Sequence, residues 1–461
     1  MMVQINTNKE KSISGGLFQF SPLIVFFAIY ALLSLYVKYL SSDTALDFST
    51  IRYSLPIFSA FIAGIFSLST FLKKTTLHRK IEVFISGSSN TSILYIYYIF
   101  IFSTAFSYIL DKNGGIHSAV NLGLTFLPAE YILPGIFILV SIFALSIGSS
   151  LGSITAIMPI AYGIAKTLGV NPALMASIVV SGAMLGDNLS MISSTTIVAT
   201  RVTESSMQAK FKDNLLIAFP AFIITVFYLC YLAKTSATIT AIPQGYLTEP
   251  TTLDYINIIP YIVIFTLSIF GLDVLAVLAI ASLLGSAIGI TYGKFSLLEA
   301  TSFIFEGFYG QKSMVRIIVL FLFISGLSQV VTHNGGFDYI LNKLKYRAKN
   351  PQQAQLLIIF LTIAVNATIA INTLSIILNG PIAKEIGDQF NIPRGRVACL
   401  LDAAATSTQG FLPYAPMMIL ASSLSHSPVL EIMKNLTYQP LLFVSMIASV
   451  FIFNYKKEST D

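Results

Sequence analysis

Long runs without a charged side chain recur along the whole of this chain. They occupy residues 18–37, 53–72, 83–110, 131–165, 167–186, 188–200, 214–233, 255–272, 274–293, 317–337, 350–383, 403–430 and 435–455. A charge near the centre of a bilayer costs at least about 2.5 kcal/mol, so such runs mark segments that cross a membrane. Only 10% of the 461 residues are charged and 55% are hydrophobic, whereas about 25% are charged in soluble proteins. The sequence predicts an all-α polytopic membrane protein with about 11–13 transmembrane segments.

The charge balance and the two cysteines exclude other classes of protein. The chain has 27 Lys and Arg residues against 21 Asp and Glu, a formal net charge of +6. The positive-inside rule places a modest excess of this kind in cytoplasmic loops, and it does not indicate a nucleic-acid partner. Cys230 and Cys399 lie inside apolar runs and form neither a disulfide framework nor a metal-ligand spacing. We therefore expect the lipid bilayer as the partner and no cofactor.

An internal repeat is visible when the two halves are compared at an offset of 221 to 222 residues. The matching segments are Asn113-Gly114-Gly115 with Asn334-Gly335-Gly336, Pro159-Ile160-Ala161 with Pro381-Ile382-Ala383, and Pro172 with Pro393. Several matches in one order at nearly one offset indicate a duplicated transporter, since such folds are commonly built from repeats. We predict a single integral membrane domain over residues 1–461, with repeats at residues 53–233 and 255–455.

The loop charges predict that the two repeats run in opposite directions through the membrane. A basic cluster precedes the span that ends near residue 110, and another follows the span that ends near residue 332. The clusters are Lys73, Lys74, Arg79 and Lys80, and Lys343, Lys345, Arg347 and Lys349. If both are cytoplasmic, the repeats have inverted topology. The same count places the N-terminus, with Lys9 and Lys11, in the cytoplasm.

Two of the runs predict broken helices. Residues 131–165 and 350–383 are longer than one span, yet as helices they reach only about 50 Å, and two crossings need about 60 Å. Each is expected to hold one span plus a short or broken element. Irregular backbone at membrane depth is tolerated only inside protein or beside a cavity. The polar residues expected to line that cavity are Ser149, Ser150, Ser153, Asn366 and Ser375.

An acid and many oxygen-bearing side chains lie close together at residues 186–196. A sodium ion needs several oxygen donors to replace its water, and a desolvated carboxylate can instead take up a proton. Asp187 could therefore bind Na⁺ and H⁺ in alternation. A helix cap is the alternative interpretation. The predicted cation- and proton-binding residues are Asp187, as the Na⁺ ligand, with Asn188, Ser193, Ser194, Thr195, Thr196, Asn372, Asp402, Thr406 and Gln409.

Asp402 begins the corresponding polar stretch of the second half. Asp187 falls opposite Gln409 at the offset of 222, so the polar breaks of both halves coincide, and facing breaks near the midplane form the site in many transporters. The alternative for Asp402 is an ion pair with Arg394 or Arg396. Two other acidic residues are predicted to have structural roles. Asp273 is expected in an aqueous turn, and Glu306 in an amphipathic interfacial helix over residues 295–311.

These stretches resemble the NhaC-type sodium/proton antiporter family over nearly the whole chain. The motifs that carry the resemblance are Ser21-Pro22-Leu23, Asn113-Gly114-Gly115, residues 147–153 with Pro159, residues 186–196 and residues 402–414. The resemblance implies a multi-pass secondary transporter of the cytoplasmic (inner) membrane, not an enzyme, that exchanges Na⁺ for H⁺ at the two breaks. One position departs from the family, which usually reads Ser-Asp-Thr-Thr where this chain has Ser193-Ser194-Thr195-Thr196. The site has one carboxylate fewer.

There are three alternatives to Na⁺/H⁺ exchange. A Na⁺-coupled transporter of a small organic anion or amino acid would use the same broken helices to hold the substrate. A membrane aspartyl protease would pair Asp187 with Asp402, but its Gly-x-Gly-Asp signature is absent, because Met184 stands where the first glycine is required. A passive channel does not need acids inside broken repeats. A homodimer is left open.

Overall fold

The computed structural model describes residues 17–43, 49–71, 75–89, 91–126, 128, 131–235, 249–310, 312–336, 339 and 348–453. Every regular element in these ranges is a helix. The chain divides into two compact units, unit 1 with Met1–Leu94 and Arg316–Ala348, and unit 2 with Tyr95–Val315 and Lys349–Asp461. The N-terminal segment with Lys9 and Lys11 lies outside the described residues, as do Lys73 and Lys74 of the first basic cluster and Lys343, Lys345 and Arg347 of the second, so the predicted orientation stays a prediction.

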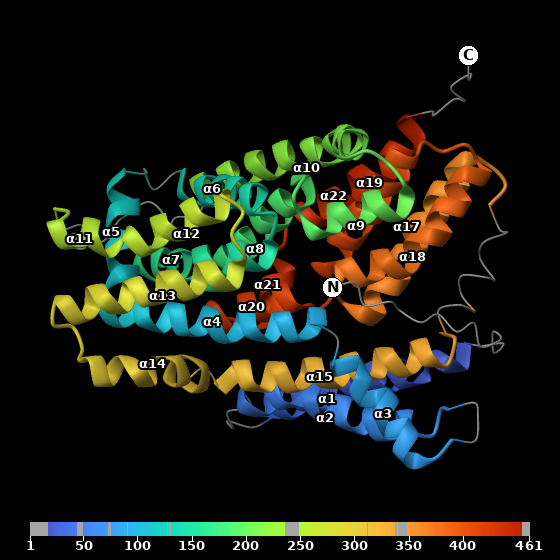
Figure 1. The fold of residues 1–461 in the computed structure, drawn as a ribbon, viewed down its shortest axis with the longest axis horizontal. Helices are drawn as coiled ribbons and strands as arrows, with labels where there is room; N and C mark the ends of the chain where they lie inside the picture. The colour runs from blue at the N-terminus through green and yellow to red at the C-terminus, as the bar shows by residue number, and fades with distance from the viewer. Residues whose placement is uncertain are drawn as a thin grey trace. The chain divides into compact units, whose positions relative to one another are not determined.

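Unit 1 contains η1 (Leu17–Phe20), α1 (Ser21–Asp43), α2 (Ser49–Ser67), α3 (Leu77–Ser88) and most of α15 (Lys312–His333). The first part of unit 2 contains α4 (Thr91–Asn113), which begins at the unit boundary, α5 (Gly115–Phe126), α6 (Ile132–Ile147), α7 (Ser150–Leu168), α8 (Pro172–Leu189), α9 (Ser194–Thr203), α10 (Met207–Thr235), α11 (Thr252–Asn257), α12 (Ile259–Ile269), α13 (Val274–Thr291) and α14 (Leu297–Gly310). The rest of unit 2 contains α17 (Pro351–Ile369), α18 (Asn372–Gln389), α19 (Arg394–Gln409), α20 (Pro416–Leu424), α21 (Val429–Lys434) and α22 (Tyr438–Ile452) (Figure 1).

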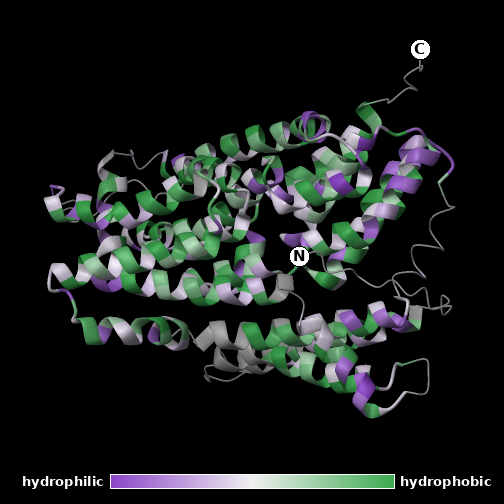
Figure 2. Ribbon diagram, viewed as in Figure 1, coloured by the Kyte–Doolittle hydropathy of each residue, from purple (hydrophilic) through white to green (hydrophobic). Residues whose placement is uncertain are grey.

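Many of these helices have the length and composition of membrane spans. Among the described residues, six helical segments qualify: Leu94–Asn113, Ser150–Leu168, Pro172–Thr203, Met207–Thr235, Val274–Thr291 and Pro351–Ile369. Shorter apolar helices accompany them, among them Ile132–Ile147 and Tyr438–Ile452. Figure 2 shows apolar residues along most of α10 and α13, and polar residues interspersed along α18. The prediction of an all-α polytopic membrane protein is confirmed.

Both predicted helix breaks are present. α6 ends at Gly148, which has a φ of 69° and leads into α7 through the capping residue Ser149. α17 ends at Ala370, with a φ of 56°, and α18 begins at Asn372. As predicted, each run holds one candidate span beside another helix: α7 beside the shorter α6, and α17 beside α18. The second helix of each run continues past the charged residue that closes the run. Lys166 therefore lies inside α7, and Lys384 inside α18.

The helices of the two halves begin at matching positions. The first residues of α18, α19 and α20 each lie 222 residues after those of α7, α8 and α9. The two Asn-Gly-Gly motifs also have the same local shape, since Gly114 and Gly335 both have positive φ and Asn113 and Asn334 are both buried. These matches support the repeat in the sequence. The bounds of the repeats and their opposite directions stay predictions.

Two glycines allow α6 and α8 to pack closely beside the predicted site. Gly182 and Gly186 lie one turn apart on α8, the spacing at which small residues let helix backbones approach in membranes. A Cβ built on Gly186 would lie 2.2 Å from the carbonyl oxygen of Ser141, and one on Gly182 would lie 2.6 Å from that of Phe137. The residue before Asp187 is therefore held directly against the backbone of α6.

Gly186→Ala is expected to lower the stability of the protein by about 1–3 kcal/mol, because the added methyl group meets backbone that cannot rotate away. The midpoint of thermal unfolding in detergent, followed by helical circular dichroism, measures the loss. Gly123→Ala is the matched control, since a Cβ there would meet only Ile164, at 3.8 Å. Equal midpoints for both variants would show that the α6–α8 approach is not tight.

Several charges outside the centre of unit 2 have structural roles. Asp273 is exposed and caps α13 by accepting from the N–H of Leu275 at 2.8 Å, and it also accepts from the hydroxyl of Tyr95 at 2.9 Å. This fits the predicted turn between two spans. Glu306 lies on α14, within the segment predicted as an interfacial helix, and accepts from the hydroxyl of Tyr108 at 2.6 Å.

Candidate functional site

The breaks in unit 2 meet around the end of α8. α8 ends at Leu189, and α9 begins at Ser194 after four residues without helical structure. α9 packs against α10, α18 and α19 (Figure 1). A Cβ on Gly148 would lie 2.8 Å from the backbone nitrogen of Ser193, so the α6–α7 break touches the α8–α9 break directly. The predicted polar stretch at residues 186–196 therefore contains a helix interruption, with Ser190 and Ser193 buried and Met191 and Ile192 exposed.

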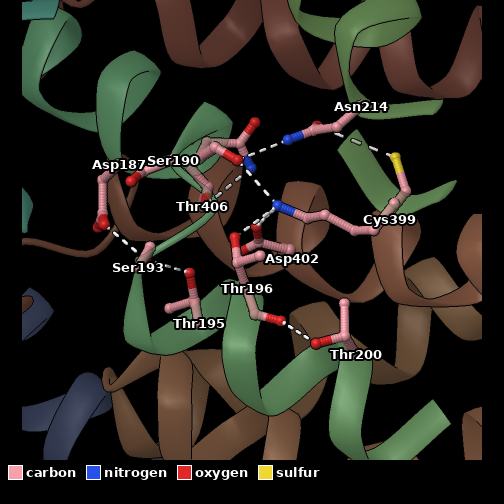
Figure 3. Close-up of polar contacts among 12 residues, drawn as sticks. Asp187, Ser190, Ser193, Thr195, Thr196, Thr200, Asn214, Cys399, Asp402 and Thr406 are labelled. Atoms are coloured by element: carbon pink, nitrogen blue, oxygen red, sulfur yellow. Dashed lines mark hydrogen bonds and ion pairs between the residues drawn. The ribbon is translucent and has the colours of Figure 1, made fainter. Parts of the chain in front are cut away.

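Asp187 is held by hydroxyl groups from both breaks. Ser193 donates to Asp187 Oδ1 at 2.7 Å, and its hydroxyl also lies 3.0 Å from that of Thr195. Figure 3 shows this chain of contacts from Asp187 through Ser193 to Thr195. Ser150, the first residue of α7, also hydrogen-bonds to Asp187 through its hydroxyl and its backbone N–H. A helix N-terminus favours negative charge beside it, so α7 stabilises the carboxylate.

Asp402 forms a buried ion pair with Lys210. Lys210 Nζ lies 2.5 Å from Asp402 Oδ2, and the two side chains are 1% and 0% exposed. The sequence analysis offered Arg394 or Arg396 as the partner, and this was wrong. Arg394 pairs with Glu204 at 2.7 Å and with Asp388 at 3.3 Å at the end of α18. The buried Arg396 donates to Gln355 at 2.9 Å and to Ser449 at 2.7 Å.

Lys210 also contacts the broken segment of the first half. Its ammonium group donates to the carbonyl oxygen of Asn188 at 2.9 Å and to Thr196 Oγ1 at 2.8 Å. Asn214, one turn further along α10, donates to the same carbonyl at 2.6 Å. The close-up in Figure 3 shows Asp402, Thr196, Asn214 and Thr406 in the same part of the site. α10 therefore connects the end of α8, the start of α9 and the middle of α19.

The polar residues of the second break connect α17, α18 and α19. Asn366 donates to Asn372 Oδ1 at 3.1 Å and to the carbonyl of Ala405 at 2.8 Å, and it accepts from Ser375 at 3.2 Å. Gln409 donates to the carbonyl of Ala370 at 3.1 Å. These contacts satisfy backbone carbonyls that the break would otherwise leave without a partner in a buried region.

The other predicted residues lie in different surroundings. Thr406 is buried and accepts from Asn188 Nδ2 at 3.4 Å. Ser149 caps α7, and Ser153 donates to the carbonyl of Ser149 at 2.8 Å. Ser194 is exposed, and its hydroxyl lies 3.3 Å from that of Thr373. The predicted residues therefore fall into three clusters. One contains Asp187, Ser193 and Thr195, another contains Asp402 with Asn188, Thr196 and Thr406, and the third, at the α17–α18 break, contains Asn366, Asn372, Ser375 and Gln409. Ser194 is exposed beside them.

Several buried acceptor oxygens in these clusters have no hydrogen-bond donor among the residues that the structure describes. They are Asn188 Oδ1, Gln409 Oε1 and both carboxylate oxygens of Asp402, of which Oδ2 has Lys210 as its ion-pair partner. Buried oxygens without a donor are costly unless something positive binds to them. Asn188 and Gln409 lie at the ends of α8 and α19, and Asp402 lies in the middle of α19. Such a set suits a small hard cation or a proton better than a metal cofactor bound by His or Cys.

Lys210 and Asn214 are the site residues that the sequence analysis missed. Lys210 precedes the charge-free run at residues 214–233, close to Lys212 and Asp213, and no function was predicted for it. The available signal was its position, because α10 begins at Met207 and places Lys210 in the first turn of a span. A burial of 99% could not be deduced without knowing what packs against that turn.

The chain is similar to antiporters along most of its length. The profile of the Na⁺/H⁺ antiporter family matches residues 4–234 and 192–453. The antiporter NhaC of Alkalihalophilus pseudofirmus is 23% identical over 364 residues, 74% of this chain and 78% of that protein. The arginine/ornithine antiporter ArcD of Halobacterium salinarum is 23% identical over 393 residues, 79% of each chain.

Two further similarities are more distant. The malate-2H⁺/Na⁺-lactate antiporter of Bacillus subtilis is 19% identical over 357 residues, 73% of this chain and 75% of that protein. Among solved structures, the YdaH transporter of Alcanivorax borkumensis is 12% identical and has a TM-score of 0.41, with 94% of this chain and 98% of that chain covered.

The family match covers both halves and includes both polar breaks. It agrees with the resemblance carried by residues 186–196 and 402–414. Membership in a family of membrane transporters also accounts for the many apolar helices and for the polar residues buried among them. The chain belongs to the Na⁺/H⁺ antiporter family, as its NhaC-type motifs predicted.

Proposed function

We propose that this protein exchanges Na⁺ for H⁺ across the cytoplasmic membrane, with Asp187 as the group that binds the two ions in turn. The observation that carries the proposal is the contrast between the two acids of the site, of which Asp402 is buried and Asp187 is half-buried. Asp402 has Lys210 as a counter-charge at 2.5 Å. Asp187 has no ion-pair partner within the described part of the chain and is held by neutral groups, the hydroxyls of Ser193 and Ser150 and the N–H of Ser150. A carboxylate in this position binds a cation or a proton to become neutral.

The surroundings of Asp187 support binding of a small cation. The hydroxyls of Ser193, Ser150 and Thr195 can turn their lone pairs to an ion and their hydrogens to a bare carboxylate, because a hydroxyl both donates and accepts. When a proton neutralises Asp187, the cation loses its main ligand. The two ions therefore compete for one group. Exchange then requires the break to face one side of the membrane at a time, which rocking of one repeat against the other would provide.

The test is Na⁺-dependent dissipation of an imposed pH gradient in proteoliposomes that contain the purified protein. We expect Na⁺ added on one side to move protons to that side without any organic solute. A gradient that decays at the rate of protein-free liposomes, at every Na⁺ concentration, would contradict the proposal.

A Na⁺-coupled transporter of a small organic solute is the second candidate. Two relatives are named for organic solutes, one for arginine and ornithine and one for malate and lactate. Ser194 removes a carboxylate that the family usually carries, and this favours a site with less cation binding. Proton movement that requires an amino acid or a small carboxylate, in the same proteoliposomes, would select this candidate over simple exchange.

Ser194→Asp is expected to raise the apparent affinity for Na⁺ by about tenfold, equivalent to about 1.4 kcal/mol. The added carboxylate would lie at the first turn of α9, beside Thr195. The Na⁺ concentration that gives half-maximal gradient dissipation measures the effect. Ser206→Asp, outside the site at the start of α10, is the control. An unchanged half-maximal concentration in Ser194→Asp would show that this position does not contribute to the ion site.

The placement in the membrane is part of the same proposal. We expect a multi-pass protein of the inner membrane with a cytoplasmic N-terminus and repeats at residues 53–233 and 255–455. The helix starts that match at 222 residues support the repeats. Na⁺ and H⁺ are the transported substrates, the lipid bilayer is the surrounding partner, and a homodimer is a possible assembly.

A further inference from the structure

We propose that the ammonium group of Lys210 is a covalently attached cation that occupies a second ion site, formed around Asp402, and excludes Na⁺ from it. The inference deepens the proposed function, since it assigns exchange to Asp187 alone. It does not require the protein to transport Na⁺, because occupancy of the Asp402 site can be measured as binding.

The surroundings of Lys210 are those of a cation site. Its three polar contacts are all oxygen atoms, a carboxylate, a backbone carbonyl and a hydroxyl, at 2.5, 2.9 and 2.8 Å. They come from three elements, α19, the last turn of α8 and the first turn of α9. The ammonium group donates hydrogen bonds to the carbonyl and to the hydroxyl, and it pairs electrostatically with the carboxylate. Carboxylate, carbonyl and hydroxyl oxygens are also the ligand types that hard metal cations select.

The site contains acceptor oxygens to which the ammonium group does not donate. Asp402 Oδ1 and Asn188 Oδ1 are buried and accept no hydrogen bond from any described residue. The carbonyl of Asn188 belongs to the last turn of α8, where the unpaired carbonyls of a helix end favour positive charge. A metal ion in place of the ammonium group could therefore reach oxygens that Lys210 leaves unused.

A purely structural ion pair does not explain this arrangement as well. A buried ion pair contributes little net stability compared with apolar residues of similar size. Lys210 also binds both sides of the α8–α9 break, at Asn188 and Thr196, rather than Asp402 alone. The geometry instead points to a site built for a positive charge at a helix break, with a lysine filling it.

The test is equilibrium binding of radioactive sodium to purified protein in detergent. Lys210→Gln removes the attached cation and shortens the side chain, and we expect it to double the sodium bound per chain relative to wild type. The additional binding should disappear in the double variant Lys210→Gln with Asp402→Asn. Lys212→Gln is the matched control, because Lys212 lies on the same helix turn but is exposed, and it should bind as wild type does. Binding by Lys210→Gln at the wild-type level would overturn the inference.

A second measurement does not depend on Lys210→Gln being folded. In Asp187→Asn, Lys210 still fills the Asp402 site, so we expect saturable sodium binding to be lost. Sodium binding by Asp187→Asn that disappears when Asp402→Asn is added would overturn the inference, because Asp402 would then be open to Na⁺ beside Lys210.

Failure of the proposed function has a different signature. If wild type neither dissipates a pH gradient nor binds sodium, Na⁺/H⁺ exchange is wrong. New sodium binding by Lys210→Gln that requires Asp402 would still support the inference about Lys210.

Discussion

Asp187→Asn is expected to abolish Na⁺-dependent dissipation of a pH gradient, to the level of protein-free liposomes, and to leave the fold intact. An amide has nearly the shape of the carboxylate and can still accept from Ser193, so the hydrogen bond at 2.7 Å has a replacement. The amide cannot carry a negative charge or be neutralised by a proton. Competition between Na⁺ and H⁺ therefore ends.

The fold of this variant is checked by its thermal unfolding midpoint, which should equal or exceed that of wild type. Removing a half-buried charge that has no ion-pair partner in the described part of the chain removes part of a desolvation cost. Asp388→Asn is the control acid, since Asp388 lies exposed near the end of α18 and pairs with Arg394 at 3.3 Å. It should retain exchange. Undiminished exchange by Asp187→Asn, in folded protein, would exclude Asp187 as the ion-binding group.

Asp402→Asn is expected to lower the stability of the protein by about 3–5 kcal/mol, the cost of leaving one partner of a buried ion pair uncompensated. The ammonium group of Lys210 is 1% exposed and would keep only the neutral oxygens of Asn188 and Thr196. The measurement is thermal unfolding in detergent, followed by helical circular dichroism because the chain contains no Trp.

Lys210→Met added to Asp402→Asn should restore most of that stability, since it removes the unpaired charge and keeps the length of the side chain. Replacement of both partners of a buried pair is often close to neutral. Arg396→Met is the comparison, because this buried cation donates to the neutral side chains of Gln355 and Ser449. Adding Arg396→Met to Asp402→Asn should not restore the stability that Asp402→Asn loses. Equal stability of Asp402→Asn and wild type would show that Lys210 does not depend on this counter-charge.

The sequence predicted the parts of the fold that depend on local composition. Absence of charge marks a span because the cost of a charge in the bilayer applies wherever the segment lies. The breaks were predicted from run length and from residues such as Ser149 and Asn372, which cap or begin the second helix of each run. The absence of charge did not show that the second helices continue past Lys166 and Lys384, because a long side chain at a helix end can reach water from within a span.

The candidate site was predicted in its residue types and only partly in its grouping. Asp187, Ser193 and Thr195 are neighbours in the sequence, and the structure brings them together. Asp402 was predicted to belong to the polar stretch at residues 402–414. The alternative was an ion pair with Arg394 or Arg396, which are close to it in the sequence. Sequence distance misled here, since Arg394 points to Glu204 and Asp388 at the end of the helix.

The sequence by itself determined that this chain is a helical membrane transporter of the Na⁺/H⁺ antiporter family, with two polar breaks that carry acids. Spans, breaks and motifs are properties of short segments, so one-dimensional patterns reveal them. Only the tertiary structure decided which acid is neutralised. Lys210 and Asp402 are far apart in the chain and meet because α10 packs against α19. The electrostatic state of a buried carboxylate depends on what lies within a few ångströms of it, and the packing of helices sets that distance.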